Sequence, residues 1–428
     1  MLITVRCASS ITGRGEIAAK KSACGTMVRR NAERSPEREE VRHMPGGSAR
    51  DVLFISAYTG LGGGESVQLN LMRALDRGRY RLHLVCPREG QLPAAARALG
   101  VQVHLLPYRA ATAYFVPVIW TRLPVVGRLT DLIRGEGIAA VHSDYHSLPF
   151  AASAARRAGV PVVWNAMGWW FPARPWQRRF FRQQVTQIIA ITQAVRDRWL
   201  AASGGFLPPE RIRVIVPGVD PDHFHPGVDG SPVRERLGLG ADVPLVGMIA
   251  RFQRVKGHDI FQAMARRVAA EVPAARFVVA GENVFGVAKD EAYKREILAA
   301  AQSDSLLRER LTYLGFWEDA RQVIAACDVI VCPSRFESLG MVHLESMAMA
   351  RPVVSMNNGG PAETVVDGET GFLVPPEDPA ALAQRVIALL RDPELRARMG
   401  AAGRARVLAH FTAAGYAEAF AQLLEDLR

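Results

Sequence analysis

The stretch PSRFESLGMVHLESMAMARP, residues 333–352, is the most informative part of this chain for predicting its fold. It follows the short apolar run VIVC, residues 329–332, which is typical of a buried parallel strand. Pro333 and Ser334 end that strand, and the apolar spacing of residues 341–350 predicts a helix. A strand, a tight turn and a helix in this order indicate the βα unit of a parallel sheet.

Two carboxylates lie eight positions apart in this unit, Glu337 in the turn and Glu345 in the helix. Gly340, between them, allows the backbone to approach a ligand closely, and the free N–H groups at a helix start bind phosphate. Glu337 can accept hydrogen bonds from sugar hydroxyl groups, and Glu345 can accept them from a ribose diol. The spacing alone leaves a second interpretation open, in which both are solvated charges of a loop and a helix.

Strand-like apolar runs alternate with helical patterns from residue 52 onward, which predicts an α/β fold with doubly wound parallel sheets. A linker rich in Pro, Gly and Asp, residues 217–232, separates two such series. The ligand site of such sheets is expected at the carboxyl ends of the strands. The expected strands are residues 52–56, 81–86, 101–105, 139–141, 162–164, 187–191 and 212–216 before the linker, and 244–250, 276–280, 311–314, 329–332, 352–355 and 372–374 after it.

Residues 333–352 resemble the E-x7-E signature of glycosyltransferase family 4, whose members are retaining enzymes with the GT-B fold. The resemblance continues through residues 352–354, 359–363, 367–368, 370–374 and 378–379, and through a helix over 380–390. It implies two Rossmann-like domains that face each other across a cleft. Residues 48–218 would form the N-terminal acceptor domain, residues 219–409 the C-terminal nucleotide-sugar donor domain, and residues 410–428 a helix that crosses back to the first domain.

Arg251 and Lys256 follow the strand expected at residues 244–250. Two cations at the carboxyl end of a strand, beside a helix start, suit a diphosphate, although two solvated surface cations would fit as well. The resemblance assigns both to the leaving diphosphate of a UDP- or GDP-sugar. With Glu337 they form the expected catalytic set. The expected donor-binding set comprises Glu345, Gly340, Met341, Val342, Gly63 and Gly64.

The resemblance implies transfer of a hexosyl group from a nucleotide-diphosphate sugar to a glycan, a lipid or a small molecule. No cofactor and no metal are expected to be required. His142 and Asp144 alternate at a strand end, but no fourth ligand is visible, so they do not predict a metal site.

One position departs from the family pattern. Many members carry His-Gly after the strand that corresponds to residues 161–164, whereas this chain reads Asn165-Ala-Met167-Gly168. Methionine in place of the histidine can neither donate nor relay a proton. Two other functions therefore stay open: a non-catalytic protein that binds a nucleotide sugar or glycan, and a nucleotide-sugar epimerase.

The net charge of +11 over 428 residues favours an anionic partner. Residues 1–50 hold ten Lys and Arg against five Glu, so they account for about +5 of that charge. Residues 1–47 are expected to be a disordered tail, or a mis-assigned start ahead of Met44. The chain shows no nucleic-acid-binding motif, so nucleic acid is not an expected partner.

The five cysteines include no CxxC pair, which indicates neither a disulfide framework nor a zinc site and fits a reducing cytoplasm. No apolar stretch reaches the ~18–20 residues that span a bilayer. Aromatic residues and Arg alternate in residues 169–182. That mixture suits a peripheral membrane contact, a stacked sugar, an anionic acceptor or a buried edge. We expect a cytoplasmic protein that can lie at the inner face of the membrane.

Overall fold

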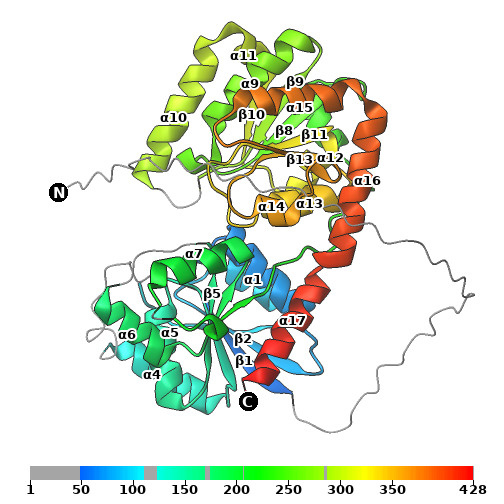
Figure 1. The fold of residues 1–428 in the computed structure, drawn as a ribbon. Helices are drawn as coiled ribbons and strands as arrows, with labels where there is room; N and C mark the ends of the chain where they lie inside the picture. Colours follow the sequence, from blue (N-terminus) through cyan, green and yellow to red (C-terminus); the bar gives the residue numbers. More distant parts are fainter. Residues whose placement is uncertain (1–48, 110–122, 169–173, 206, 284–286, 428) are drawn as a thin grey trace, which may run out of the picture. The chain divides into compact units, whose positions relative to one another are not determined.

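Two parallel β-sheets with helices between their strands organise the chain (Figure 1). The structure, a computed structural model, describes residues 49–109, 123–168, 174–205, 207–283 and 287–427. The tail expected at residues 1–47 lies outside the described residues. Residues 48–428 form one unit that contains both sheets.

The first sheet has seven strands in the order β3-β2-β1-β4-β5-β6-β7, and all neighbours pair in parallel. Its strands are β1 (Arg50–Ile55), β2 (Tyr80–Cys86), β3 (Gln102–Leu105), β4 (Ala140–Ser143), β5 (Val162–Ala166), β6 (Gln187–Ala190) and β7 (Ile212–Val214). Its helices are α1 (Gly63–Ala74), α2 (Gln91–Ala98), α4 (Pro124–Gly135), α5 (Leu148–Ala158), α6 (Pro175–Gln184) and α7 (Gln193–Ser203), followed by the 3-10 turn η1 (Pro209–Arg211).

The second sheet has six parallel strands in the order β10-β9-β8-β11-β12-β13. Its strands are β8 (Leu245–Ile249), β9 (Arg276–Ala280), β10 (Leu311–Gly315), β11 (Val329–Cys332), β12 (Val353–Met356) and β13 (Gly371–Val374). Its helices are α8 (Ser231–Leu237), the 3-10 turn η2 (Arg254–Lys256), α9 (His258–Glu271), α10 (Ala288–Ser303), α11 (Ser305–Arg310), α12 (Ala320–Ala326), α13 (Met341–Ala348), α14 (Pro361–Thr364), α15 (Pro379–Arg391) and α16 (Pro393–His410).

The predicted fold of two Rossmann-like halves with parallel sheets is confirmed. The central strands are buried on both faces: residues 52–55 of β1 and 329–331 of β11 are at most 1% exposed. Continuous apolar runs are what such strands require, because helices cover both sides of a parallel sheet. The strand order reverses between β1 and β4 and between β8 and β11, so the loops after these four strands open the crevices in which α/β proteins bind ligands.

The last helix, α17 (Ala413–Asp426), returns to the first sheet and packs against α1 (Figure 1). Phe420 is fully buried, and its ring lies 6.1 Å from that of Phe54 on β1. The Arg50 guanidinium donates to the Leu424 carbonyl oxygen at 2.9 Å, and Arg213 pairs with Asp426 at 2.5 Å. Apolar burial and surface charge therefore both attach the C-terminus to the first half.

Glu363 of α14 connects the two halves through the start of α7. Its carboxylate accepts from the backbone N–H groups of Gln193 and Ala194, both at 2.8 Å. Thr192, the N-cap of α7, also donates its hydroxyl hydrogen to the Ser338 carbonyl oxygen at 2.9 Å. A carboxylate at a helix N-terminus satisfies free donors and complements the helix dipole.

We expect Glu363→Ala to lower the free energy of unfolding by about 1–2 kcal/mol, because two backbone donors lose a charged acceptor. Glu363→Gln should cost less than half of this, since the amide oxygen still accepts one bond. Urea denaturation measures both values. Glu369→Ala, at an exposed position nearby, is the matched control. An equal loss in Glu369→Ala and Glu363→Ala would contradict the capping role.

Candidate active site

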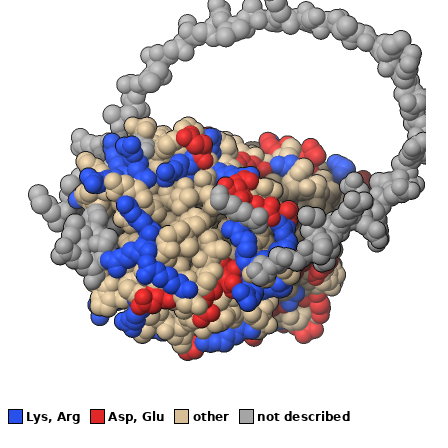
Figure 2. Space-filling model, turned by 90° about the horizontal axis from the view of Figure 1, so that it is seen from below, with Lys and Arg blue, Asp and Glu red and all other residues tan. Residues whose placement is uncertain are grey.

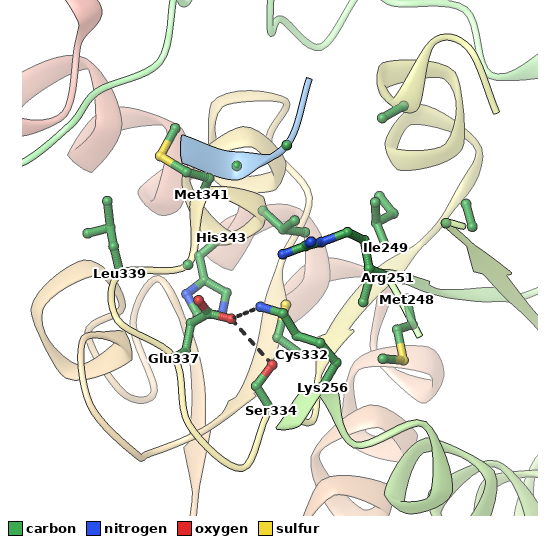
Figure 3. Close-up of a pocket in the computed structure, with 18 of the residues that line it drawn as sticks. Met248, Ile249, Arg251, Lys256, Cys332, Ser334, Glu337, Leu339, Met341 and His343 are labelled. Atoms are coloured by element: carbon green, nitrogen blue, oxygen red, sulfur yellow. Dashed lines mark hydrogen bonds and ion pairs between the residues drawn. The ribbon is translucent and has the colours of Figure 1, made fainter. Parts of the chain in front are cut away.

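The crevice of the second sheet brings the predicted cations and carboxylate together. Arg251 and Lys256 lie in the loop after β8, and Glu337 lies in the loop after β11, the strand next to β8. Lys256 closes the 3-10 turn η2 just before α9. Figure 3 shows the Lys256 ammonium and the Glu337 carboxylate pointing toward each other, with Arg251 extending into the same space. Lys256 and Glu337 are 81 positions apart in the sequence but in contact in the structure, because β8 and β11 are neighbouring strands.

Lys256 and Glu337 form a half-buried ion pair. The Lys256 Nζ atom lies 2.6 Å from Glu337 Oε2, and the Ser334 hydroxyl donates to the same oxygen at 3.3 Å. Burial by itself raises the pKa of Glu337, but the ammonium and the hydroxyl outweigh burial and hold that pKa below its usual value. Glu337 is therefore a carboxylate at neutral pH, ready to accept from hydroxyl groups.

Helix α13 begins at the wall of the same crevice. Gly340 is its N-cap with φ of 87°, and the residues of its first turn follow at Met341 and Val342. The first N–H groups of a helix have no partner within it, so they are available to a phosphate. His343 is fully buried in this turn. Its Nδ1 lies 3.4 Å from Thr364 Oγ1, a long hydrogen bond, and its Nε2 has no hydrogen-bond partner among the described residues. Burial lowers the pKa of His343 to about 4, so the ring is neutral.

Gly340 is required by the turn itself. Its positive φ disfavours side chains, and a Cβ at this position would clash with the ring of His343. We expect Gly340→Ala to lower the free energy of unfolding by about 1–3 kcal/mol and to displace the α13 start. Thermal denaturation and phosphate binding measured by calorimetry check both effects. The matched Gly368→Ala change also has positive φ but open space around it, so it reports strain without the clash.

A cavity of about 460 Å³ surrounds these groups. Both halves of the chain line it, since Gly63 and Gly64 of α1 lie in its wall. Of the predicted site residues, the described lining contains Arg251, Lys256, Glu337, Gly340, Met341, Val342, Gly63 and Gly64. The structure therefore assembles eight of the nine predicted positions in one cavity.

Glu345 is the ninth, and it does not lie among the described lining residues of this cavity. It sits half-buried in the second turn of α13, and no described residue donates a hydrogen bond to its carboxyl group. Burial raises its pKa to about 7. The predicted contact with a ribose stays a prediction.

A second cavity, of about 760 Å³, opens beside the first and lies mostly against the first sheet. Arg251, Lys256, Glu337 and Met167 line both cavities. Its other wall comes from the loops after β1 and β4 and from the start of α1, and it includes Asp144 and Glu65. Two ligands, one in each cavity, would therefore both lie next to the Lys256–Glu337 pair.

Met167 lies between the two cavities, where the family pattern places a histidine. The glycine that follows it is essential for the geometry, because Gly168 has φ of 116° and a Cβ would overlap the side chain of Ser338 on the other half. His142, one of the two residues weighed as metal ligands in the sequence, is buried against the rings of Phe54 and Phe420. No group of three His, Cys, Asp or Glu among the described residues is arranged to hold a metal ion.

Several groups in these walls are not among the nine residues predicted from the sequence. Ser334 and His343 lie within residues 333–352, and both line the first cavity. Glu65, in the first turn of α1, accepts from Gly62 N–H at 3.1 Å and lines the second cavity. These residues lie near the points where the strand order of each sheet reverses. The sequence alone does not reveal the strand order.

Helix α6 holds part of residues 169–182, for which a peripheral membrane contact is one of the four interpretations left open by the sequence. Residues 169–173 lie outside the described residues, and α6 carries the rest. Phe180 and Phe181 are buried, whereas Arg178, Arg179 and Arg182 are exposed. Searched over its described residues, the chain has no helix both long and apolar enough to cross a bilayer.

Comparison with known proteins agrees with this architecture. Residues 61–223 match the family model Glycosyltransferase Family 4, and residues 232–406 match Glycosyl transferases group 1. The chain is 32% identical to alpha-maltose-1-phosphate synthase of Mycolicibacterium smegmatis over 62% of its own length and 69% of that protein. It is also 32% identical to D-inositol 3-phosphate glycosyltransferase of Frankia alni over 64% of its length and 73% of that protein.

Solved structures share the fold. The Anabaena protein HepE, in a complex with UDP and glucose, superimposes with a TM-score of 0.72 at 22% identity and covers 87% of this chain and 99% of HepE. The two halves, the shared crevice and the matched models define a glycosyltransferase of the GT-B type. The chain belongs to glycosyltransferase family 4.

Proposed function

We propose that this protein moves a hexosyl group from a UDP- or GDP-sugar to a hydroxyl-bearing acceptor, with retention of configuration at the anomeric carbon. One observation carries the proposal: Arg251, Lys256, Glu337 and the start of α13 converge on one cavity at the carboxyl ends of β8 and β11. Cations and helix N–H groups bind a diphosphate, while a carboxylate binds sugar hydroxyl groups. A sugar nucleotide is the ligand that presents both.

The roles follow from position. Arg251 and Lys256 would neutralise the charge that develops on the departing diphosphate, and the N–H groups of Met341 and Val342 would bind its oxygens. Glu337, held by Lys256, would orient the sugar ring. Because these groups supply the positive charge, we propose that no divalent metal is required. Gly63 and Gly64 would close the donor cavity from the first half, and Glu345 would bind the ribose.

Retention would follow from attack on the face that the leaving group departs from. The acceptor would occupy the second cavity, and its hydroxyl proton would pass to the leaving phosphate oxygen as the new glycosidic bond forms and the old one breaks. Met167 cannot take part in proton transfer. This route does not need it to, because the leaving group itself is the base.

The test is turnover of a panel of UDP- and GDP-sugars by the purified chain, with and without EDTA. Release of the nucleoside diphosphate together with an α-linked product from an α-linked donor, seen by NMR, supports retaining transfer. A product of inverted configuration, or activity lost in EDTA and restored by Mg²⁺, would contradict the corresponding part of the proposal.

Met167 favours a second candidate, a protein that binds a nucleotide sugar without turnover. It predicts tight donor binding, seen as a thermal shift, but no product with any acceptor over long incubation. Met167→His would then be expected to produce activity. An epimerase would convert the donor sugar with no acceptor present.

We further propose that the acceptor reaches the enzyme near an anionic surface such as the inner face of a membrane. Arg178, Arg179 and Arg182 are exposed on α6, and Figure 2 shows Lys and Arg at several places over the face seen from below. Cosedimentation with vesicles of anionic lipid, compared with zwitterionic vesicles, tests this. Arg178→Glu with Arg182→Glu should abolish any binding, since both are exposed on α6.

A further inference from the structure

The second cavity carries an unusual charge distribution on its acceptor side. Its described charged residues are Arg251, Lys256 and Glu337, shared with the donor cavity, and Glu65 and Asp144, which belong to the first half. Lys256 already pairs with Glu337, whereas Arg251 lies near enough to Glu65 to lower the pKa of that carboxyl group. The described charged residues that the first half itself contributes to this cavity are both carboxylates.

Both carboxylates are held by the backbone. Asp144 accepts from Ala57 N–H at 2.8 Å and from Ser147 N–H at 2.6 Å, and Glu65 accepts from Gly62 N–H at 3.1 Å. A carboxylate offers about four acceptor positions, so each retains capacity for a ligand. Burial raises the pKa of Glu65, the negative charge of Asp144 also raises it, and the positive charge of Arg251 lowers it. A cationic ligand beside the two acids would favour their charged forms in the same way as Arg251 does.

Buried polar atoms at the same wall also lack partners. His142 is 2% exposed and lines the cavity, and neither of its ring nitrogens has a hydrogen-bond partner among the described residues. Gln68 is 5% exposed, lines the cavity and has an unpaired Nε2. Burial lowers the pKa of His142 to about 3, so this ring is neutral and adds no positive charge. Such unpaired buried polar atoms at a cavity wall can form hydrogen bonds with a polar ligand.

The remaining titratable groups in this wall are aromatic neighbours. His146 is half-buried, with its ring 5.1 Å from that of Tyr58 and 5.3 Å from that of Tyr145. Aromatic rings suit the apolar face of a sugar or cyclitol and also attract an ammonium group. Residues 169–173, which follow Gly168 in the chain, contain no charged residue.

We infer that the second cavity selects its acceptor by charge and takes an amine-bearing polyol, such as an amino sugar or aminocyclitol, in preference to its neutral and phosphorylated counterparts. Glu65 and Asp144 would bind the ammonium group, while His142 and Gln68 would bind hydroxyl groups. The inference rests on the proposed function and narrows its acceptor. The names of the listed relatives point in both directions, since two contain a sugar or cyclitol phosphate and one contains an amino sugar.

The test uses three acceptors that share one ring and differ in charge: glucosamine, glucose and glucose 6-phosphate. Each is assayed for acceptor-dependent release of the nucleoside diphosphate, and for direct binding by saturation-transfer NMR with free UDP or GDP present. We expect glucosamine to bind about 10-fold to 100-fold more tightly than glucose 6-phosphate, the range that charge-assisted hydrogen bonds span. Glucose 6-phosphate binding as tightly as glucosamine would overturn the inference.

Two variants separate the carboxylates from the fold. Glu65→Gln and Asp144→Asn should each reduce the advantage of glucosamine by about 10-fold, while nucleotide affinity changes by less than about twofold. Glu65→Gln can still accept from Gly62 N–H, so it remains informative if Asp144→Asn fails to fold. Asp131→Asn, exposed on α4 outside the cavity, is the matched control and should leave all values unchanged.

The outcomes distinguish the two proposals. Failure to bind or turn over any nucleotide sugar would contradict the proposed function, while the direct-binding arm would still rank the three acceptors. Donor turnover with a preferred anionic acceptor, or an amine preference that survives in both variants, would contradict this inference alone.

Discussion

Lys256→Met is expected to lower kcat for sugar transfer by about 10²–10³-fold, the usual effect of removing one group that stabilises charge in a transition state. The ammonium lies 2.6 Å from Glu337 Oε2 and faces the donor cavity, so its loss removes a cation from the diphosphate and releases the carboxylate. Glu337→Gln should lower kcat to a similar degree, because the amide no longer anchors the lysine or accepts fully from sugar hydroxyl groups. Single-turnover kinetics with the active donor measure both.

Stability separates this role from mere ion pairing. Each single change leaves a half-buried partner uncompensated and should cost about 1–3 kcal/mol of unfolding free energy. The double variant Lys256→Met with Glu337→Gln should regain most of that stability but no activity. Glu296→Gln breaks the exposed Arg254–Glu296 pair nearby, at 2.8 Å, and serves as the control with little expected effect on either quantity. Activity that returns with stability in the double variant would argue against a catalytic role.

Glu345→Gln is expected to stabilise the protein at pH 8 and to have no effect at pH 4. Burial raises the pKa of Glu345 from 4.5 to about 7, so the folded state binds its proton more tightly than the unfolded state does. The folded state is therefore favoured below pH 4.5, and this advantage is lost as pH rises toward 7. Above pH 7 the charged form costs about 3 kcal/mol at 1.36 kcal/mol per pKa unit, and glutamine avoids that cost.

Urea denaturation of the unchanged protein and of Glu345→Gln across pH 4–8 measures how the difference in their unfolding free energies grows with pH. A constant difference at all pH values would show that the carboxyl group does not titrate with folding. The same variant tests the predicted ribose contact: if ribose hydroxyl groups donate to the carboxylate, Glu345→Gln should weaken nucleotide binding at pH 8 even as it stabilises the free protein. Unchanged nucleotide affinity would instead confine Glu345 to a structural position.

Much of the fold could be predicted because parallel strands buried on both faces need unbroken apolar runs. Residues 329–332 were expected as a strand and are β11, and the helix expected at 341–350 is α13, which ends at Ala348. The last helix was expected from 410, but α16 runs to His410 and α17 begins only at Ala413. Helix ends depend on caps, such as Thr412 accepting from Gly415 N–H, that periodicity does not show.

The donor-side residues could be named from local motifs, because Arg251, Lys256 and Glu337 lie in the short connections that follow β8 and β11. The acceptor side could not. Glu65 and Asp144 lie 79 positions apart, and only the pairing of β1 with β4 brings the start of α1 and the loop after β4 to one crevice. Burial, which sets the charge of His142 and Glu345, likewise depends on neighbours from distant segments.

Short stretches of apolar pattern, glycine and charge are enough to predict the α/β class, the division into two βα series and the donor motif. Which strands are neighbours becomes known only from the folded chain. Because of this strand order, Met167 lines both cavities and Lys256 pairs with Glu337. Glu65 and Asp144 line only the second cavity. The physical reason is that hydrogen-bonded strand order and side-chain burial are contacts between residues far apart in the chain, which local pattern does not encode.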